Sequence, residues 1–178
     1  MTRIALPTRA TLESPELQDR WDRLASRGPI LNINRVFLAN PAIELNARRI
    51  WTASGLVPRS RELLILRAAF LKQSTYEWHQ HVRIARSEGL SDADINGVRD
   101  WRAAAGLSAE EQSMLAYVDA LNAPSGASDE DFAAFAKGRS QADIVGVTFL
   151  ITLYFQLASV MAALRLDTED PFVGWELS

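Results

Sequence analysis

The chain has 178 residues and contains no cysteine. This absence excludes disulfide bonds, thiolate metal ligands, a cysteine nucleophile and any Cys-x-x-Cys redox centre. It is consistent with a reducing cytoplasm, which is the location we expect. Histidine is almost as scarce. The sequence has only two, His79 and His81, which are separated by a single residue. Any chemistry that uses imidazole must therefore come from this short segment.

The sequence also lacks an excess of positive charge. It has 19 lysines and arginines against 22 aspartates and glutamates, which gives a net charge of -3. A nucleic-acid-binding protein needs a basic face to neutralise phosphates, so we expect no nucleic-acid partner. The first residues contain no apolar stretch of signal-peptide length. We interpret residues 1–13 as a partly ordered N-terminal arm.

Charge is missing altogether from one long segment, residues 144–164. These 21 residues are enough to cross a bilayer as a helix. Five polar residues interrupt the segment: Thr148, Thr152, Tyr154, Gln156 and Ser159. A helix that is apolar all round is also typical of a buried core or of a subunit interface. We expect one of these two environments and no membrane partner.

Helical periodicity and punctuating prolines and glycines predict an all-α, single-domain helical bundle over residues 1–178. We expect seven to nine helices, several of which begin at proline, as at Pro15, Pro41 and Pro58. Later helices are predicted to begin with Ser-x-x-acid capping boxes. The serines of these boxes are Ser74, Ser91, Ser108, Ser128 and Ser140.

The first candidate site lies in the stretch STYEWHQHVRIARSEGL, residues 74–90. Ser74, Glu77 and His81 share one face of a helix, because they are three, four and seven residues apart. A carboxylate one turn from an imidazole can orient the ring and raise its pKa, which makes a proton shuttle near neutral pH. The same pattern fits a plain capping box with a surface histidine beside it. The residues alone leave both interpretations open.

A metal site at the two histidines is disfavoured by helix geometry. His79 lies about 200° around a helix from His81, so the two rings cannot chelate one ion from a regular helix. Helical ligands are expected four residues apart, as in His-Glu-x-x-His. We therefore predict no metal and no other cofactor, and we interpret His79 as a bystander.

Glu62 is the third ionisable candidate, because it lies within the strongly apolar segment RELLILRAAFL. If it faces the core, burial raises its pKa and makes it a potential general acid or base. An arginine could hold a substrate carboxylate by a two-pronged contact. The candidates for substrate binding are Ser74, Trp78, Arg59, Arg61 and Arg83.

The stretch RSRELLILRAAFLKQSTYEWHQHVRIARSEGLSDADI, residues 59–95, resembles the carboxymuconolactone decarboxylase family, which belongs with the alkylhydroperoxidase D-like proteins. The resemblance extends more loosely over residues 35–166. The peroxidase branch carries a Glu, a Cys-x-x-Cys pair and a His four residues later. These positions correspond here to Glu62, Ser74, Glu77 and His81. Both sulfurs are missing, so cysteine-based peroxide reduction is excluded.

The resemblance implies an all-α fold around a helical hairpin, assembled into a dimer, trimer or hexamer. It also implies an acid–base pocket in which His81 delivers a proton, Glu77 orients it and Glu62 acts as a second relay. We therefore expect a cofactor-independent lyase or isomerase acting on a small carboxylated or lactone substrate. Two alternatives remain: a metal-dependent hydrolase or oxygenase, and a non-catalytic binding or assembly protein that keeps the fold.

Overall fold

The computed structural model describes residues 2–177, apart from the side chains of Glu44 and Leu45. Within this part of the chain, all regular secondary structure is helical, which confirms the predicted fold class. The α-helices are α1 (Pro15–Ala25), α2 (Asn32–Ala39), α3 (Pro41–Ala53), α4 (Pro58–Leu71), α5 (Thr75–Ser87), α6 (Asp92–Gly97), α7 (Ala109–Asn122), α8 (Asp129–Ala136) and α9 (Gln141–Leu164). Two 3-10 helices, η1 (Arg9–Thr11) and η2 (Val98–Asp100), complete the order.

The helix starts follow the predicted local signals with two exceptions, at Ser74 and Ser140. Proline opens α1, α3 and α4, and capping boxes are present at Ser91, Ser108 and Ser128. At the start of α9, the Ser140 side chain accepts the N–H of Asp143, but the reciprocal backbone bond that would complete the predicted capping box is absent. The capping box predicted at Ser74 is wrong, because its side chain makes no capping hydrogen bond at the start of α5.

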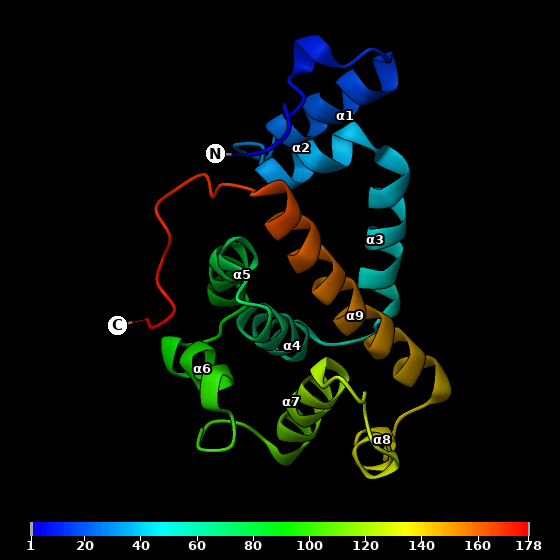
Figure 1. The fold of residues 1–178 in the computed structure, drawn as a ribbon, viewed down its shortest axis with the longest axis vertical. Coiled ribbons are helices and arrows are strands. Elements are labelled where there is room, and N and C mark those ends of the chain that lie inside the picture. Colours follow the sequence, from blue (N-terminus) through cyan, green and yellow to red (C-terminus); the bar gives the residue numbers. More distant parts are fainter. Residues whose placement is uncertain (1, 178) are drawn as a thin grey trace.

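Helix α4 forms the centre of the molecule. It packs against α5, α7 and α9, as Figure 1 shows, and every residue from Glu62 to Ala69 is buried. A short turn at residues 72–74 connects α4 to α5, and these two helices form a closely packed hairpin. The hairpin packs the two candidate segments, one in α4 and the other in α5, against each other.

Helix α9 contains the long uncharged segment and by length and composition could cross a membrane. Only 39% of the residues in its most apolar stretch are buried inside the protein. One face, which includes Leu150, Tyr154 and Met161, packs into the core. The opposite face leaves Val145 and Phe149 more than half exposed. The helix is therefore a core element on one side and an exposed apolar surface on the other.

The crossing of α3 and α9 depends on Gly146. A Cβ atom at this position would clash with the carbonyl oxygen of Ala53 and with the backbone of Ser54. Because these neighbours are backbone atoms, they cannot move aside by a change of rotamer. Glycine thus permits the close approach that holds the end of α3 against α9.

We expect Gly146→Ala to lower the free energy of unfolding by about 1–3 kcal/mol, the usual cost of overpacking. Urea denaturation measures this change. Gly106→Ala is the matched control, because its nearest non-neighbouring atom would lie 3.5 Å from the new methyl group. Equal stability of the two variants would contradict the proposed steric role of Gly146.

Candidate active site

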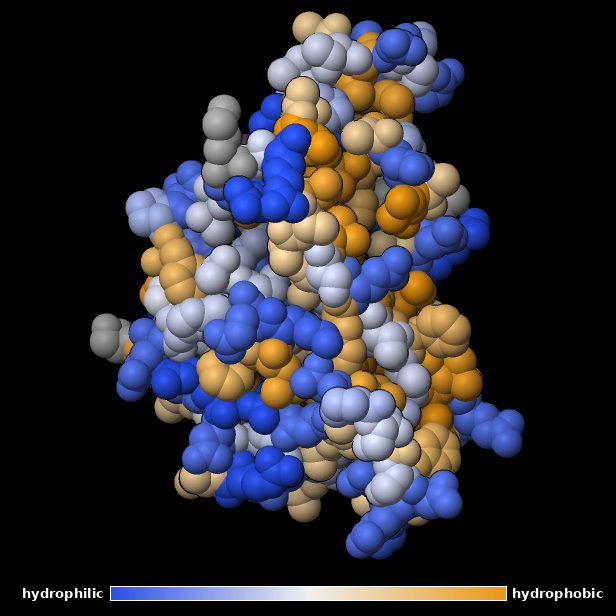
Figure 2. Space-filling model, in the orientation of Figure 1, coloured by the Kyte–Doolittle hydropathy of each residue, from blue (hydrophilic) through white to orange (hydrophobic). Residues whose placement is uncertain are grey.

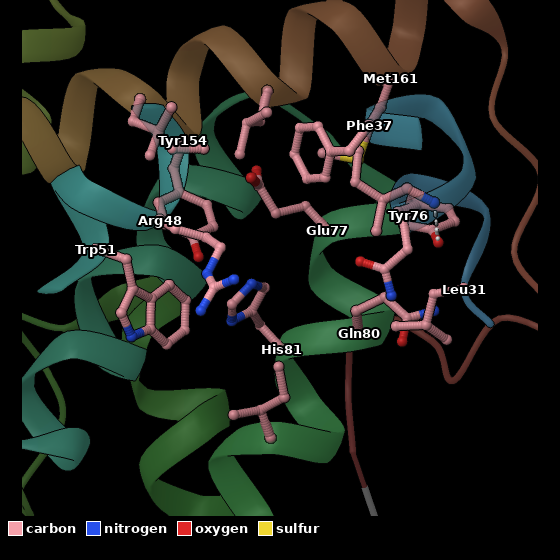
Figure 3. Close-up of a pocket in the computed structure, with 16 residues that line it drawn as sticks. Leu31, Phe37, Arg48, Trp51, Tyr76, Glu77, Gln80, His81, Tyr154 and Met161 are labelled. Carbon is pink, nitrogen blue, oxygen red and sulfur yellow. Dashed lines mark hydrogen bonds between the residues drawn. The ribbon is translucent and has the colours of Figure 1, made fainter. Parts of the chain in front are cut away.

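A cavity of about 270 Å³ lies between α2, α3, α5 and α9. Most of its wall is apolar, and its charged or titratable lining residues are Arg48, Tyr76, Glu77, His81 and Tyr154. Figure 3 shows Glu77 and His81 reaching into this space from α5, with Arg48 and Trp51 facing them from α3. A concave apolar pocket with a few polar groups is the usual form of a ligand site.

His81 is held from behind by Glu62. Its Nδ1 lies 2.7 Å from Oε2 of Glu62, which is completely buried in α4. The second carboxylate oxygen, Oε1, accepts a hydrogen bond from Nε of Arg61 at 3.3 Å. A carboxylate that accepts at Nδ1 fixes the ring and its tautomer. This arrangement leaves Nε2 as the imidazole nitrogen available to a ligand in the cavity.

Glu77 has the opposite environment. Its side chain is buried, and neither carboxylate oxygen has a hydrogen-bond partner among the described residues. Burial raises the pKa of the Glu77 carboxyl well above its usual range. In Figure 3 this carboxylate points from α5 towards α9. Glu77 is therefore suited to hold a proton that it can give to a ligand.

The structure exchanges the two carboxylate roles expected from the sequence. Glu62, which is 19 residues from His81, bonds the imidazole, whereas Glu77 does not, despite lying one turn away on the same helix. The side chains of Glu77 and His81, the predicted i, i+4 pair, both point into the cavity but form no hydrogen bond with each other. Two carboxylates in contrasting surroundings are a common basis for dividing acid and base functions.

Aromatic rings surround His81. The ring of Tyr154 lies edge-on at 5.1 Å between centroids, and that of Trp51 lies at 6.2 Å. The guanidinium of Arg61 stacks over Trp51 at 4.5 Å. Burial, with Glu77 and Glu62 nearby, raises the pKa of the Tyr154 hydroxyl well above its usual value. Tyr154 therefore stays protonated near neutral pH and can only act there as a neutral hydrogen-bonding group.

The C-terminal segment fixes the other end of the α5 wall. The Tyr76 hydroxyl donates to Oε1 of Glu169 at 2.8 Å, and the Gln80 side chain donates to Oε2 at 2.6 Å. The backbone N–H of Ile33 in turn donates to the Tyr76 oxygen. These bonds occupy the Tyr76 hydroxyl and the side-chain nitrogen of Gln80, so both residues serve as a rigid part of the pocket wall.

Several residues proposed from the sequence as substrate contacts lie outside this pocket. Arg59 forms ion pairs with Asp94 and Glu111, both at 2.7 Å. Arg83 is largely exposed and pairs with Asp170. Arg61 lies behind the wall, where it contacts Glu62 and Trp51.

The two other proposed contacts, Ser74 and Trp78, are also absent from the lining of the pocket. Ser74 borders a separate, smaller hollow between the start of α5 and the end of α9. Trp78 is completely buried in the core, and its Nε1–H donates to the carbonyl oxygen of Gly174 at 2.9 Å. Trp78 therefore anchors the C-terminal segment to α5.

His79 points away from His81, as helix geometry predicts. It is buried beneath the C-terminal segment, where its Nδ1 accepts the N–H of Val173 at 3.3 Å. Burial and the nearby Arg83 lower the pKa of His79. Its environment is thus that of a neutral core histidine. No group of three or more potential metal-ligating His, Cys, Asp or Glu side chains occurs among the residues that the structure describes.

Three pocket residues were not identified from the sequence: Arg48, Trp51 and Tyr154. Among the described residues that line the cavity, Arg48 alone carries a guanidinium, and none of the carboxylates described forms an ion pair with it. The one available signal was Tyr154, a polar group within an otherwise apolar run that needs a suitable environment when buried. Arg48 and Trp51 gave no local signal, because only tertiary packing brings α3 over α5.

Similar solved structures share this fold. An AhpD-type antioxidant defence candidate of unknown function from Agrobacterium tumefaciens is 25% identical, with a TM-score of 0.68 over 76% of this chain and 96% of that one. An uncharacterised peroxidase-related protein with an alkylhydroperoxidase AhpD core, from Ralstonia eutropha JMP134, is 16% identical, with a TM-score of 0.80 over 99% and 97%. A debrominase, Bmp8, solved as a cysteine-to-alanine variant with 2,3,4-tribromopyrrole, is 14% identical, with a TM-score of 0.77 over 95% and 92%.

The chain thus has the fold of AhpD-like proteins. Residues 39–120 match the model of the carboxymuconolactone decarboxylase family, and the chain has no Cys-x-x-Cys pair. No curated protein gives a significant sequence match. The family match contains Arg48, Trp51, Glu62, Glu77 and His81, whereas Tyr154 lies beyond it.

We expect Glu77→Gln to stabilise the protein increasingly between pH 4 and pH 8. A raised pKa in the folded state means that the unfolded chain releases the Glu77 proton first, so the wild type loses stability as pH rises above the ordinary glutamate range. Each tenfold difference in proton affinity corresponds to about 1.4 kcal/mol. Urea denaturation across this pH range measures the difference between the variant and the wild type.

Glu62→Gln is the control for that experiment. It changes a buried carboxylate that has two partners, so it should destabilise the protein at neutral pH. If Glu77→Gln lowered stability to the same extent at pH 8, Glu77 would not be an unpaired buried acid.

Proposed function

We propose that this protein is a cofactor-independent lyase or isomerase that moves protons on a carboxylated or lactone substrate. The observation that carries the proposal is the buried, unpaired Glu77 in the same cavity as an imidazole anchored by Glu62. General acid–base catalysis needs two proton-handling groups of different character near one ligand. The absence of cysteine excludes the dithiol chemistry of the peroxidase branch.

In the proposed reaction, Arg48 binds the substrate carboxylate that is retained. For a decarboxylation, the bond between carbon and the leaving carboxylate breaks, and its electron pair passes into a conjugated enolate. A proton from His81 then completes the new C–H bond. For an isomerisation, His81 removes a proton from one carbon and Glu77 donates one to the conjugated end. Transfer of the proton on His81 to Glu77 then restores both groups, so charge and atoms balance.

The neutral Glu77 carboxyl supports this chemistry as a hydrogen-bond donor to the developing enolate oxygen. In an apolar cavity such a bond is stronger than in water, because the local dielectric constant is low. Glu62 is a positioning residue, since it contacts the imidazole and not the cavity. Its negative charge stabilises the imidazolium that forms when His81 takes up a proton.

We also propose that the protein forms a homo-oligomer through the outer face of α9. Val145 and Phe149 on that face are 54% and 57% exposed, and Val57 nearby in the connection before α4 is 63% exposed. Large exposed apolar side chains on one side of a helix are typical of an interface. Light scattering of the wild type and of Phe149→Asp would measure the oligomeric state.

We expect His81→Ala to reduce kcat by about 10²–10⁴-fold. A thermal-shift screen with lactones and unsaturated or keto acids identifies a substrate for this assay. Added imidazole should restore part of the activity, because the deleted ring leaves space in the cavity wall. Undiminished kcat in the alanine variant would remove His81 from the mechanism.

We expect Arg48→Ala to raise KM by about 10–100-fold, the effect of losing a charge-assisted hydrogen bond. Arg83→Ala is the matched control, because Arg83 pairs with Asp170 at the surface and does not line the cavity. Steady-state kinetics with the same substrate compare the two variants. A larger effect at Arg83 than at Arg48 would place the carboxylate elsewhere.

A further inference from the structure

A second and larger cavity, of about 500 Å³, lies where α2, α3 and α9 meet. Figure 2 shows hydrophobic residues gathered on the surface over this junction. Its described lining is Ile4, Ile33, Val36, Phe37, Ala39, Asn40, Ile43, Asn46, Ala47, Ile50, Leu153, Gln156, Leu157, Val160 and Leu164. None of these residues is ionisable, and the three amides among them are all exposed. The interior of this cavity is therefore apolar.

The second cavity shares part of its wall with the first. Five residues border both: Ile33, Phe37, Ala47, Leu153 and Leu157. Only apolar side chains thus lie at the boundary, and Ala47 leaves little bulk there. The catalytic candidates are on one side of this boundary, and an uncharged space of about twice the volume is on the other. A short acid bound in the first cavity would leave the larger space unused.

We propose, on the basis of the function proposed above, that the substrate is an amphipathic carboxylic acid. Its carboxylate contacts Arg48, its reacting carbon lies beside Glu77 and His81, and its apolar portion occupies the second cavity. The adjacent residues Arg48 and Ala47 of α3 face the first cavity and the shared boundary, respectively, which suits a ligand that joins a charged group to an apolar one.

The charge near Arg48 favours an anionic group. Burial lowers the pKa of Arg20, and repulsion from Arg48 and Arg23 lowers it further, so the guanidinium groups of Arg20 and Arg48 lie close enough to interact. An anion placed between or beside like charges relieves such repulsion. The cavity on the far side of the boundary offers no charge, so it fits only the apolar part of the ligand.

Calorimetric titration with straight-chain carboxylates from butanoate to decanoate, all below micelle-forming concentrations, tests this inference. We expect the affinity to rise about fourfold with each added methylene group, the ratio that corresponds to ~0.8 kcal/mol per buried CH2. A series in which affinity is independent of chain length would overturn the proposal.

Val160→Trp supplies the matched structural test. Val160 lines the second cavity but not the first, so a bulky ring there should weaken decanoate binding by about tenfold or more and leave butanoate unchanged. Ala133→Trp is the control, because it places the same ring at an exposed position of α8 that lines neither cavity. Equal decanoate affinity in both variants would contradict occupancy of the second cavity.

Light scattering of the same variants separates a ligand from a protein partner in this cavity. If Val160→Trp dissociates an oligomer while decanoate affinity stays constant, a second copy of the chain fills the space and the proposal is wrong. The titrations measure binding and not turnover, so they are independent of the acid–base mechanism. Loss of chain-length dependence with kcat still sensitive to His81 would remove this inference and keep the proposed function.

Discussion

The hydrogen bond between Glu62 and His81 is the constraint on which the rest of the site depends. Glu62 lies in the centre of the most buried helix, where an ionised carboxylate is costly unless it is paired. Arg61 and His81 supply those pairs from its own helix and from α5. By satisfying Glu62, His81 also fixes the rotation of α5 against α4. That rotation determines which α5 side chains face α9.

Glu77 shows what this rotation costs. One turn before His81, it must face the same cavity, where no described group pairs with it. A buried polar group without a partner reduces stability, and natural proteins retain such groups mainly where function requires them. The environments of the two carboxylates are therefore coupled through α5. The hydrogen bond of Glu62 to His81 fixes the rotation of α5, and this rotation leaves Glu77 without a partner. A capping role for Glu77 would have relieved this cost, but its side chain lies on the inner face of the helix.

Local signals in the sequence were sufficient to predict the helices and to select three residues of the site, Glu62, Glu77 and His81. Proline and serine marked the helix starts because capping is decided within four residues. The failure at Ser74 has the same physical basis, since Ser-x-x-Glu is identical at Ser74 and Ser108 and only tertiary burial distinguishes them. Arg48 and Tyr154 could not be predicted as neighbours of His81. Their helices, α3 and α9, cross at Gly146, where the lack of a side chain avoids a backbone clash, and no local pattern encodes this close approach.

The cavity walls also differ in how firmly they are held. The firmly held wall carries the groups proposed to transfer protons, and the other wall would contact the apolar part of the ligand. The α5 wall is fixed at three levels, by Glu62 at His81, by Glu169 at Gln80 and Tyr76, and by the Trp78 contact with the C-terminal segment. These bonds hold the groups that move protons, for which small displacements are costly. The walls of the second cavity come instead from α2, α3 and α9, and α9 and all of α2 except Ala39 lie outside residues 39–120. Substitutions in α2 and α9 can therefore change which apolar group is accepted without disturbing the Glu62–His81 bond, so relatives that share this hairpin can retain its geometry while differing in substrate.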